Sequence, residues 1–107
     1  MKLILAIVSR DDSSTVNAAL NKEGFQVTKL SSTGGFLRAG NITLMVGCKN
    51  EDVEKAIGII QEYSKERTEM VPANLGYDMG NYMSFPVEVK VGGATIFVLD
   101  VEQFKKV

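Results

Sequence analysis

A glycine-rich stretch in the first half of the chain holds residue types that could bind a phosphate. It reads Thr33-Gly34-Gly35-Phe36-Leu37-Arg38-Ala39-Gly40-Asn41 and lies between two strand-like runs. Adjacent glycines adopt positive φ without penalty, so neighbouring N–H groups can converge on an anion, and Arg38 could add a charge-assisted contact. The pattern is not a Walker A loop, because no Gly-Lys-Ser/Thr follows and the next run is a strand. Since Gly-Gly and Gly-Asn pairs also occur in ordinary turns, these residues alone leave a ligand loop and a plain turn equally open.

Composition restricts the function classes. The chain has 107 residues, 45% of them hydrophobic, which fits one domain that buries about two thirds of its unfolded surface. Its 12 basic and 13 acidic side chains give a net charge of −1, so no global field would attract DNA. With one cysteine, Cys48, and no histidine, we expect neither a metal nor another cofactor. No apolar run is long enough to span a membrane, and these features together indicate a soluble, cytoplasmic protein.

Apolar periodicity predicts alternating strands and helices. Residues 3–8 are continuously apolar, as in a strand covered on both faces. The pair Gly92-Gly93 separates two strand-like runs and is a strong signal for a two-residue hairpin. The expected elements are a strand at 3–8, a helix from 9–14 to a left-handed cap at Gly24, strands at 25–30 and 41–48, a helix that Asn50 caps, an irregular connection at 66–85, and strands at 86–91 and 94–99.

The order of these elements predicts a fold. A βαββαβ chain with an added C-terminal strand is typical of a ferredoxin-like α+β sheet, with both helices on one face. Val16 and Leu20, like Ala56 and Ile60, follow helical spacing and are expected to pack on that face. Because strand 3–8 is apolar on both sides, something outside the monomer must bury its other side. We therefore predict a closed cyclic homo-oligomer formed through the open face.

Three segments together resemble the cyclic-di-AMP receptor family of PII-like signal-transduction proteins. They are Thr28-Lys29-Leu30, the glycine-rich stretch 33–41, and the run 86–98 that contains Gly92-Gly93. The resemblance extends from residue 1 to about residue 104. It implies a single PII-like domain over residues 1–107 and a homotrimer with a cyclic-di-AMP site in each cleft between neighbours. It also implies no catalytic turnover. Residues 31–41 look like a short counterpart of the PII T-loop, and residues 66–85 look like the enlarged B-loop of this family.

The resemblance also implies which residues hold the nucleotide. Positions that match those holding an adenine and its phosphate-ribose ring are Thr28, Gly35, Phe36, Leu37, Asn41 and the backbone of Gly47. Their chemistry fits: hydroxyl and amide groups can read an adenine edge, and Phe36 and Leu37 can cover its flat face. The family usually has Asn and Arg where this chain has Gly24 and Gln26. An amide at 26 lacks the charge-assisted phosphate contact of arginine, for which Arg38 is a candidate replacement.

Three functions follow as hypotheses. The first is a trimeric sensor that binds cyclic-di-AMP or a related adenine nucleotide and converts occupancy into loop order for an unknown downstream protein. The second is a paralogue, marked by Gly24 and Gln26, that has lost or changed its nucleotide specificity or binds a protein partner. The third is an enzyme, which the sequence disfavours because it offers no histidine base and no metal-binding set.

Overall fold

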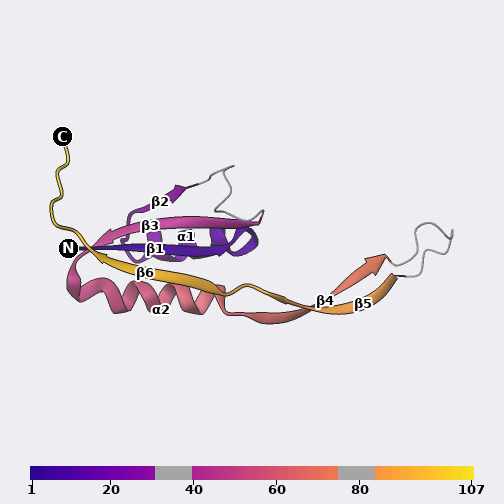
Figure 1. Ribbon diagram of the computed structural model, residues 1–107. Helices are drawn as coiled ribbons and strands as arrows, with labels where there is room; N and C mark the ends of the chain where they lie inside the picture. Colours follow the sequence, from indigo (N-terminus) through magenta and orange to yellow (C-terminus); the bar gives the residue numbers. More distant parts are fainter. Residues whose placement is uncertain (31–39, 75–83) are drawn as a thin grey trace.

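The computed structural model describes residues 1–30, 40–74 and 84–107. It consists of a sheet with two helices and a two-stranded arm that projects from one end of the sheet (Figure 1). The elements are β1 (Lys2–Ser9), α1 (Arg10–Lys22), β2 (Val27–Leu30), β3 (Asn41–Cys48), the 3₁₀ turn η1 (Asn50–Asp52), α2 (Val53–Ser64), β4 (Arg67–Asn74), β5 (Ser84–Val91) and β6 (Ala94–Asp100).

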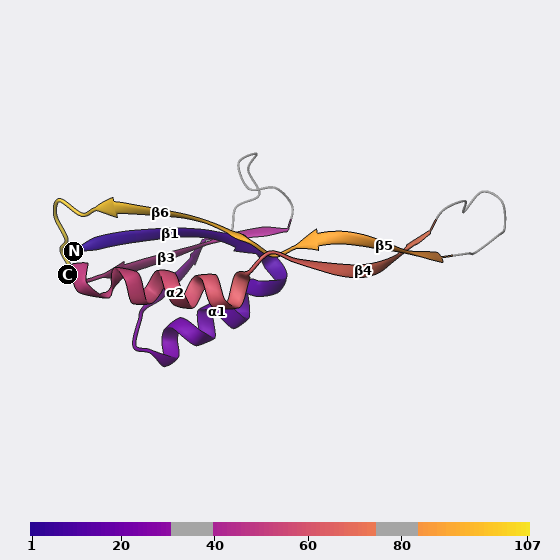
Figure 2. The ribbon, with the colours of Figure 1, turned by 90° about the horizontal axis from the view of Figure 1, so that it is seen from below.

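The main sheet has the order β2-β3-β1-β6, and all its neighbouring strands are antiparallel. Both helices lie on one face of this sheet (Figure 2). With β6 as the fourth strand of the sheet, this is the predicted ferredoxin-like arrangement, and the α+β fold class is confirmed. The strand predicted as an addition at 94–99 is this fourth strand, because the strand predicted at 86–91 belongs to the arm, and no strand follows β6.

The core lies between the sheet and the helices because strand and helix periods place apolar residues there. Alternate residues of β1 and β3, such as Ile4 and Leu44, are fully buried, as are Val16 and Leu20 of α1 and Ile60 of α2. Cys48 is also buried and unpaired, as a small hydrophobic residue. The helical stripes predicted from the sequence therefore form the core.

The ends of α1 follow from local chemistry. Ser9 caps the helix, because its Oγ accepts a hydrogen bond from the Asp12 N–H at 3.3 Å. At the other end Gly24 has φ +89°, and the N–H groups of Gly24 and Phe25 donate to the carbonyls of Asn21 and Leu20. This is a Schellman cap, which confirms the predicted left-handed glycine. Asn50 does not cap α2: it begins η1, and neither η1 nor α2 has a side-chain cap.

The predicted hairpin around Gly92-Gly93 is wrong. β5 pairs with β4, and β6 pairs with β1, so the two glycines carry the chain from the arm into the main sheet. Both have positive φ, +83° and +84°, which suits this abrupt change of direction as well as it would suit a tight turn. The irregular connection predicted at 66–85 is also wrong over β4, while residues 75–83 lie outside the described chain.

The sheet face opposite the helices is apolar and is covered by no element that the structure describes (Figure 2). Leu3, Leu5 and Ile7 of β1 are half-buried and alternate with the core residues of that strand. By register, Leu5 lies between Met45 of β3 and Phe97 of β6, and Phe97 is 52% exposed. As predicted, β1 is apolar on both sides although both helices cover the same face of the sheet.

Candidate functional site

A pocket of about 330 Å³ opens on the uncovered sheet face at the end that carries both chain termini. Strand register brings its residues together: Thr28 pairs with Met45, and Leu3 pairs with Gly47. The chain after β6 returns to this end, where the Val101 N–H donates to the Met1 carbonyl at 3.2 Å. The pocket is lined by Met1, Leu3, Gln26, Thr28, Met45, Gly47, Val101 and Phe104.

The lining of this pocket combines flat apolar surface with neutral hydrogen-bonding groups. Leu3, Met45 and Phe104 supply apolar surface, and Phe104 is 64% exposed. The hydroxyl of Thr28 and the amide of Gln26 both donate and accept hydrogen bonds. At Gly47 an added Cβ would lie 3.4 Å from the Met1 Cε, so glycine leaves its backbone open to close approach. Among the described residues no charged side chain lines the pocket, which suits a neutral heterocycle better than a phosphate.

A second, charged hollow of about 290 Å³ lies beside the first and shares Gln26 and Gly47 with it. It also contains Lys49 and Lys55, and the Lys55 ammonium is 3.2 Å from the Glu23 carboxylate. Gln26 thus stands between an apolar pocket and a hollow that contains cations. The sequence analysis did not identify Lys49 or Lys55, because only the pairing of β2 with β3 brings the start of β2 beside the residues that follow Gly47.

Cys48 also lines the charged hollow but has no reactive character. Burial, followed by the nearby Asp52 charge, raises the pKa of its thiol, so the thiol stays protonated at neutral pH. Within residues 1–30, 40–74 and 84–107, no group of three His, Cys, Asp or Glu side chains could hold a metal ion. Among the helices of the described chain, none has the length and apolar character required to cross a membrane.

The structure brings together only part of the predicted site. Gln26, Thr28 and Gly47 share the apolar pocket. Asn41 lies at the other end of β3, where it pairs with Ser9, and the six-residue separation from Gly47 corresponds to about 20 Å along a strand. The predicted ligand residues Gly35, Phe36, Leu37 and Arg38 lie outside the described residues. Met1, Met45 and Phe104 were missed, because no local motif marks them and only strand register and the return of the C-terminal chain place them here.

Comparison with known proteins identifies the family of this chain. The family model described as "Cyclic-di-AMP receptor" matches residues 1–107, the whole chain. The chain belongs to the cyclic-di-AMP receptor family. A similar solved structure is the crystal structure of a functionally unknown protein from Pediococcus pentosaceus ATCC 25745, which is 38% identical with a TM-score of 0.77. The alignment covers 99% of this chain and 96% of that one.

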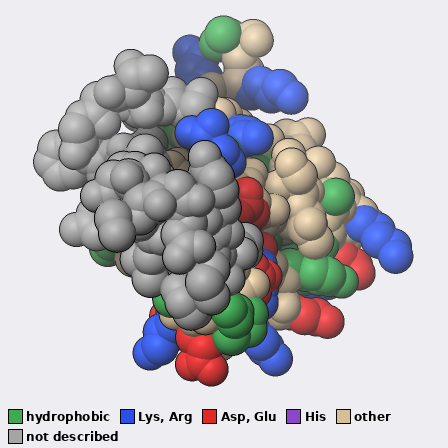
Figure 3. All heavy atoms as spheres, turned by 90° about the vertical axis from the view of Figure 1, so that its right-hand side faces the viewer, with side chains coloured by type: hydrophobic (Ala, Val, Ile, Leu, Met, Phe, Trp, Pro, Cys, Tyr) green, Lys and Arg blue, Asp and Glu red, His purple; other side chains and the backbone are tan. Residues whose placement is uncertain are grey.

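Membership of the cyclic-di-AMP receptor family confirms the resemblance inferred from the sequence. The family is one of receptors and not of enzymes, and the solved structure confirms the fold at full length. Seen from the end of the arm (Figure 3), the described part of this face carries both basic and acidic side chains, as expected from a net charge of −1.

Proposed function

We propose that this chain is a signal-transduction protein that binds cyclic-di-AMP, or a related adenine nucleotide, in the clefts between subunits of a homotrimer. One observation carries the proposal: in a chain of this receptor family, Gln26, Thr28 and Gly47 line a pocket that opens on an uncovered apolar sheet face. The pocket offers neutral donors and acceptors for a base edge, together with apolar surface for its flat face. A cytoplasmic location remains a prediction.

The open face supports assembly from identical subunits. Phe97 and Leu99 of β6 are 52% and 46% exposed, and Leu3 and Leu5 lie beside them on β1. Fully burying one such side chain stabilises an interface by about 1.5–3 kcal/mol. A second copy of the same face is the simplest cover, and a closed ring leaves no copy with its face exposed.

The separation of Asn41 from Gly47 also supports a site between subunits. About 20 Å along one strand is farther than hydrogen bonds to a single base can reach, so the pair could serve one base only if two subunits each supplied one of them. This arrangement is testable with mixed oligomers of Thr28→Val and Asn41→Ala chains. If the two residues serve one base from different subunits, some clefts of a mixed oligomer contain two unaltered residues and recover binding. If both act from the same chain, every cleft remains impaired.

A change of ligand specificity is the second candidate function, and Gln26 favours it. The neutral amide stands where the family usually has arginine, and no Lys or Arg side chain lines the apolar pocket among the described residues. The adjoining hollow offers Lys49 and Lys55 for a phosphate, although Glu23 and Asp52 line it too and Lys55 is paired with Glu23. Such a paralogue would bind another adenine nucleotide, or a protein partner in place of a nucleotide.

Isothermal titration tests both candidates. The purified protein would be titrated with cyclic-di-AMP, cyclic-di-GMP, ATP and AMP, with Thr28→Val as the site variant. Micromolar binding of cyclic-di-AMP that Thr28→Val weakens supports the receptor, whereas tighter binding of ATP or AMP supports changed specificity. No heat with any of the four nucleotides contradicts nucleotide sensing. Chromatography of the recovered nucleotides checks the predicted lack of turnover, and any phosphodiester cleavage would contradict it.

A further inference from the structure

The first turn of α1 lies between the bases of two segments that are far apart in the sequence. On one side, Ser9 pairs with Asn41, and the Arg10 N–H donates to the Gly40 carbonyl at 2.5 Å. Gly40 and Asn41 are the residues at which the chain leaves the glycine-rich stretch and enters β3. The start of α1 is therefore tied by backbone contacts to the end of that stretch.

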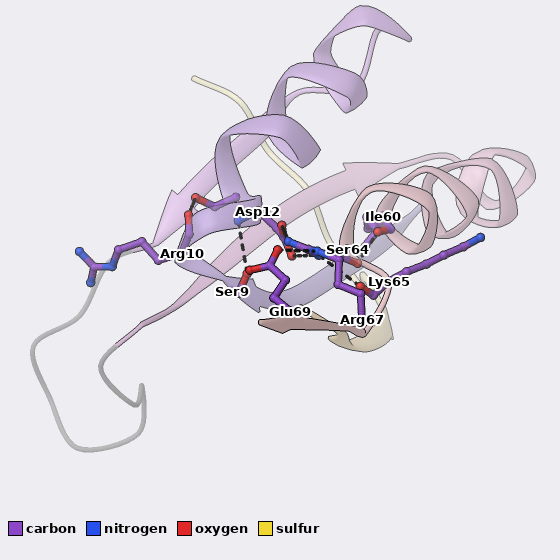
Figure 4. Close-up of polar contacts among 9 residues, drawn as sticks. Ser9, Arg10, Asp12, Ile60, Ser64, Lys65, Arg67 and Glu69 are labelled. Carbon is purple, nitrogen blue, oxygen red and sulfur yellow. Dashed lines mark hydrogen bonds and ion pairs between the residues drawn. The ribbon is translucent and has the colours of Figure 1, made fainter. Parts of the chain in front are cut away.

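On its other side, the same turn is tied to the arm through Asp12 and Arg67 (Figure 4). The two terminal guanidinium nitrogens of Arg67, Nη2 and Nη1, donate to the two carboxylate oxygens of Asp12 at 2.9 and 3.2 Å. Asp12 is only 6% exposed, and Arg67 is the first residue of β4. Such a fork-to-fork pair fixes both distance and orientation, because two parallel bonds resist rotation as well as separation.

Further polar contacts and close packing join this pair to the other residues at the base of the arm. Arg67 also donates to the Lys65 carbonyl at 3.2 Å, and its Nε is 3.4 Å from the Glu69 carboxylate. Gly92, which directly follows β5, packs so closely that an added Cβ would lie 2.6 Å from both Arg67 and the Lys65 carbonyl, and 3.2 Å from the Asp12 carboxylate. Both strands of the arm thus begin or end against one buried carboxylate.

We infer that the first turn of α1, through the Asp12–Arg67 pair packed on Gly92, is a relay that couples the end of the glycine-rich stretch to the arm. A displacement at Gly40 moves Arg10, and the helical turn carries Asp12 and therefore Arg67 with it. The direction is reciprocal, so a change at Arg67 also reaches the Arg10–Gly40 contact. The part of the inference that concerns a ligand rests on the proposed function, because nucleotide binding would be the event that moves Gly40.

Amide hydrogen exchange measured by NMR on the ligand-free protein tests the coupling directly. Arg67→Lys keeps the charge and loses the fork, and it is expected to speed exchange of the Arg10 amide by about threefold or more. Glu69→Gln is the matched control, since it removes a carboxylate from the same guanidinium without touching α1, and it should leave Arg10 unchanged. If Arg67→Lys alters arm amides alone, the relay is refuted.

A second variant reaches the pair from the opposite side without changing any charge. Gly92→Ala places a methyl group against Arg67, against the Lys65 carbonyl to which Arg67 donates, and against the Asp12 carboxylate. It should also speed exchange at Arg10. The matched variant is Gly93→Ala, where the nearest contact of an added Cβ is 3.8 Å away at a similar φ. Both alanines carry the same backbone strain, so equal effects at Arg10 would show that strain, and not the pair, is responsible and would overturn the inference.

Saturating cyclic-di-AMP then tests transmission. In the wild-type protein the nucleotide should slow exchange in β4 and β5, whereas Asp12→Asn should bind it with an affinity within about threefold and lose most of that protection. Equal protection in both proteins contradicts the relay. If calorimetry detects no nucleotide, the proposed function fails, and the ligand-free comparison of Arg67→Lys with Glu69→Gln still decides whether the coupling exists.

Discussion

Replacing Asp12 by asparagine should destabilise the protein substantially, although Asp12 is far from the candidate pocket. The substitution keeps the shape of the side chain and removes its charge. Asn can still accept one hydrogen bond from Arg67, but the two-bond ion pair at 2.9 and 3.2 Å is lost. The mutation therefore isolates the charge of one buried carboxylate.

The expected loss follows from the surroundings of both partners. A hydrogen bond to a charged group contributes about 1.5–3 kcal/mol. Asp12 also lies in the first turn of α1, where a negative charge contributes about 0.3–1 kcal/mol. Arg67 is not stranded, because its side chain is 42% exposed and keeps the Lys65 carbonyl and Glu69 as partners. We therefore expect Asp12→Asn to reduce the free energy of unfolding by about 2 kcal/mol at pH 7.

The pH dependence gives this prediction a second, independent test. The Arg67 hydrogen bonds lower the pKa of Asp12 from its ordinary value of 3.8, against an opposing effect of burial. A carboxylate with a lowered folded-state pKa contributes stability above its unfolded pKa and loses it as the pH falls through the folded value. The difference between wild type and Asp12→Asn should therefore be full at pH 6 and shrink below pH 4.

Urea unfolding at fixed protein concentration, repeated from pH 7 to pH 2.5, measures this difference. Fixed concentration matters because the proposed assembly would add to the apparent stability. Glu69→Gln is a suitable control, since Glu69 is half exposed and its pair should contribute little. A difference below about 0.5 kcal/mol at pH 7, or one that stays constant down to pH 2.5, would refute the reasoning.

Three further predictions concern the open face, the pocket and the glycines. Phe97→Glu should dissociate the proposed homotrimer in light scattering, because it places a charge on the open sheet face, whereas Tyr63→Glu, at a comparably exposed aromatic on α2, should not. An intact Phe97→Glu oligomer would contradict assembly through this face. Gln26→Arg should raise cyclic-di-AMP affinity in calorimetry by about tenfold, through a charge-assisted phosphate contact. If the variant and the wild-type protein bind cyclic-di-AMP equally well, at low salt and at high salt, the phosphates lie elsewhere. Gly24→Ala should lower the free energy of unfolding in urea by about 1 kcal/mol, because an alanine there meets no neighbouring atom but must keep the positive φ. Gly58→Ala inside α2 should raise it by about 0.5–1 kcal/mol. Changes of the same sign in the two variants would contradict this account.

The sheet, the helices and their buried faces were predictable because each is determined by local periodicity. Alternation in β1 and β3 and helical spacing at Val16, Leu20 and Ile60 carry enough information to define the core. The open apolar face was predictable for a similar reason, since β1 has apolar residues on both sides and both helices lie on one. Family membership, too, was visible in three short segments and is confirmed over the whole chain.

Strand partners near the arm were not predictable from local signals. Gly92-Gly93 has positive φ in the structure, as a tight hairpin would require, yet it joins strands of different sheets. β5 pairs with β4 and not with β6. In sequence β4 resembles a loop, because it starts with the polar Arg67 and contains Pro72. Pro72 pairs with Pro86 in the register, and proline is tolerated only where its missing N–H would point outward from an edge. A two-stranded ribbon with two edges meets that condition, whereas a central strand does not.

The same ribbon explains why small changes at its base matter. Within the described residues each arm strand pairs only with the other, so the contacts at the base orient the whole element. β4 has eight residues, which span about 26 Å, and a rotation of about 5° at Arg67 would displace its far end by about 2 Å. The candidate pocket lies at the opposite end of the sheet from this base. If a nucleotide binds there, its effect would have to cross the sheet to reach the arm, either along β6 through Gly92-Gly93 or at the β1–α1 end, where Arg10 contacts Gly40 and Asp12 contacts Arg67.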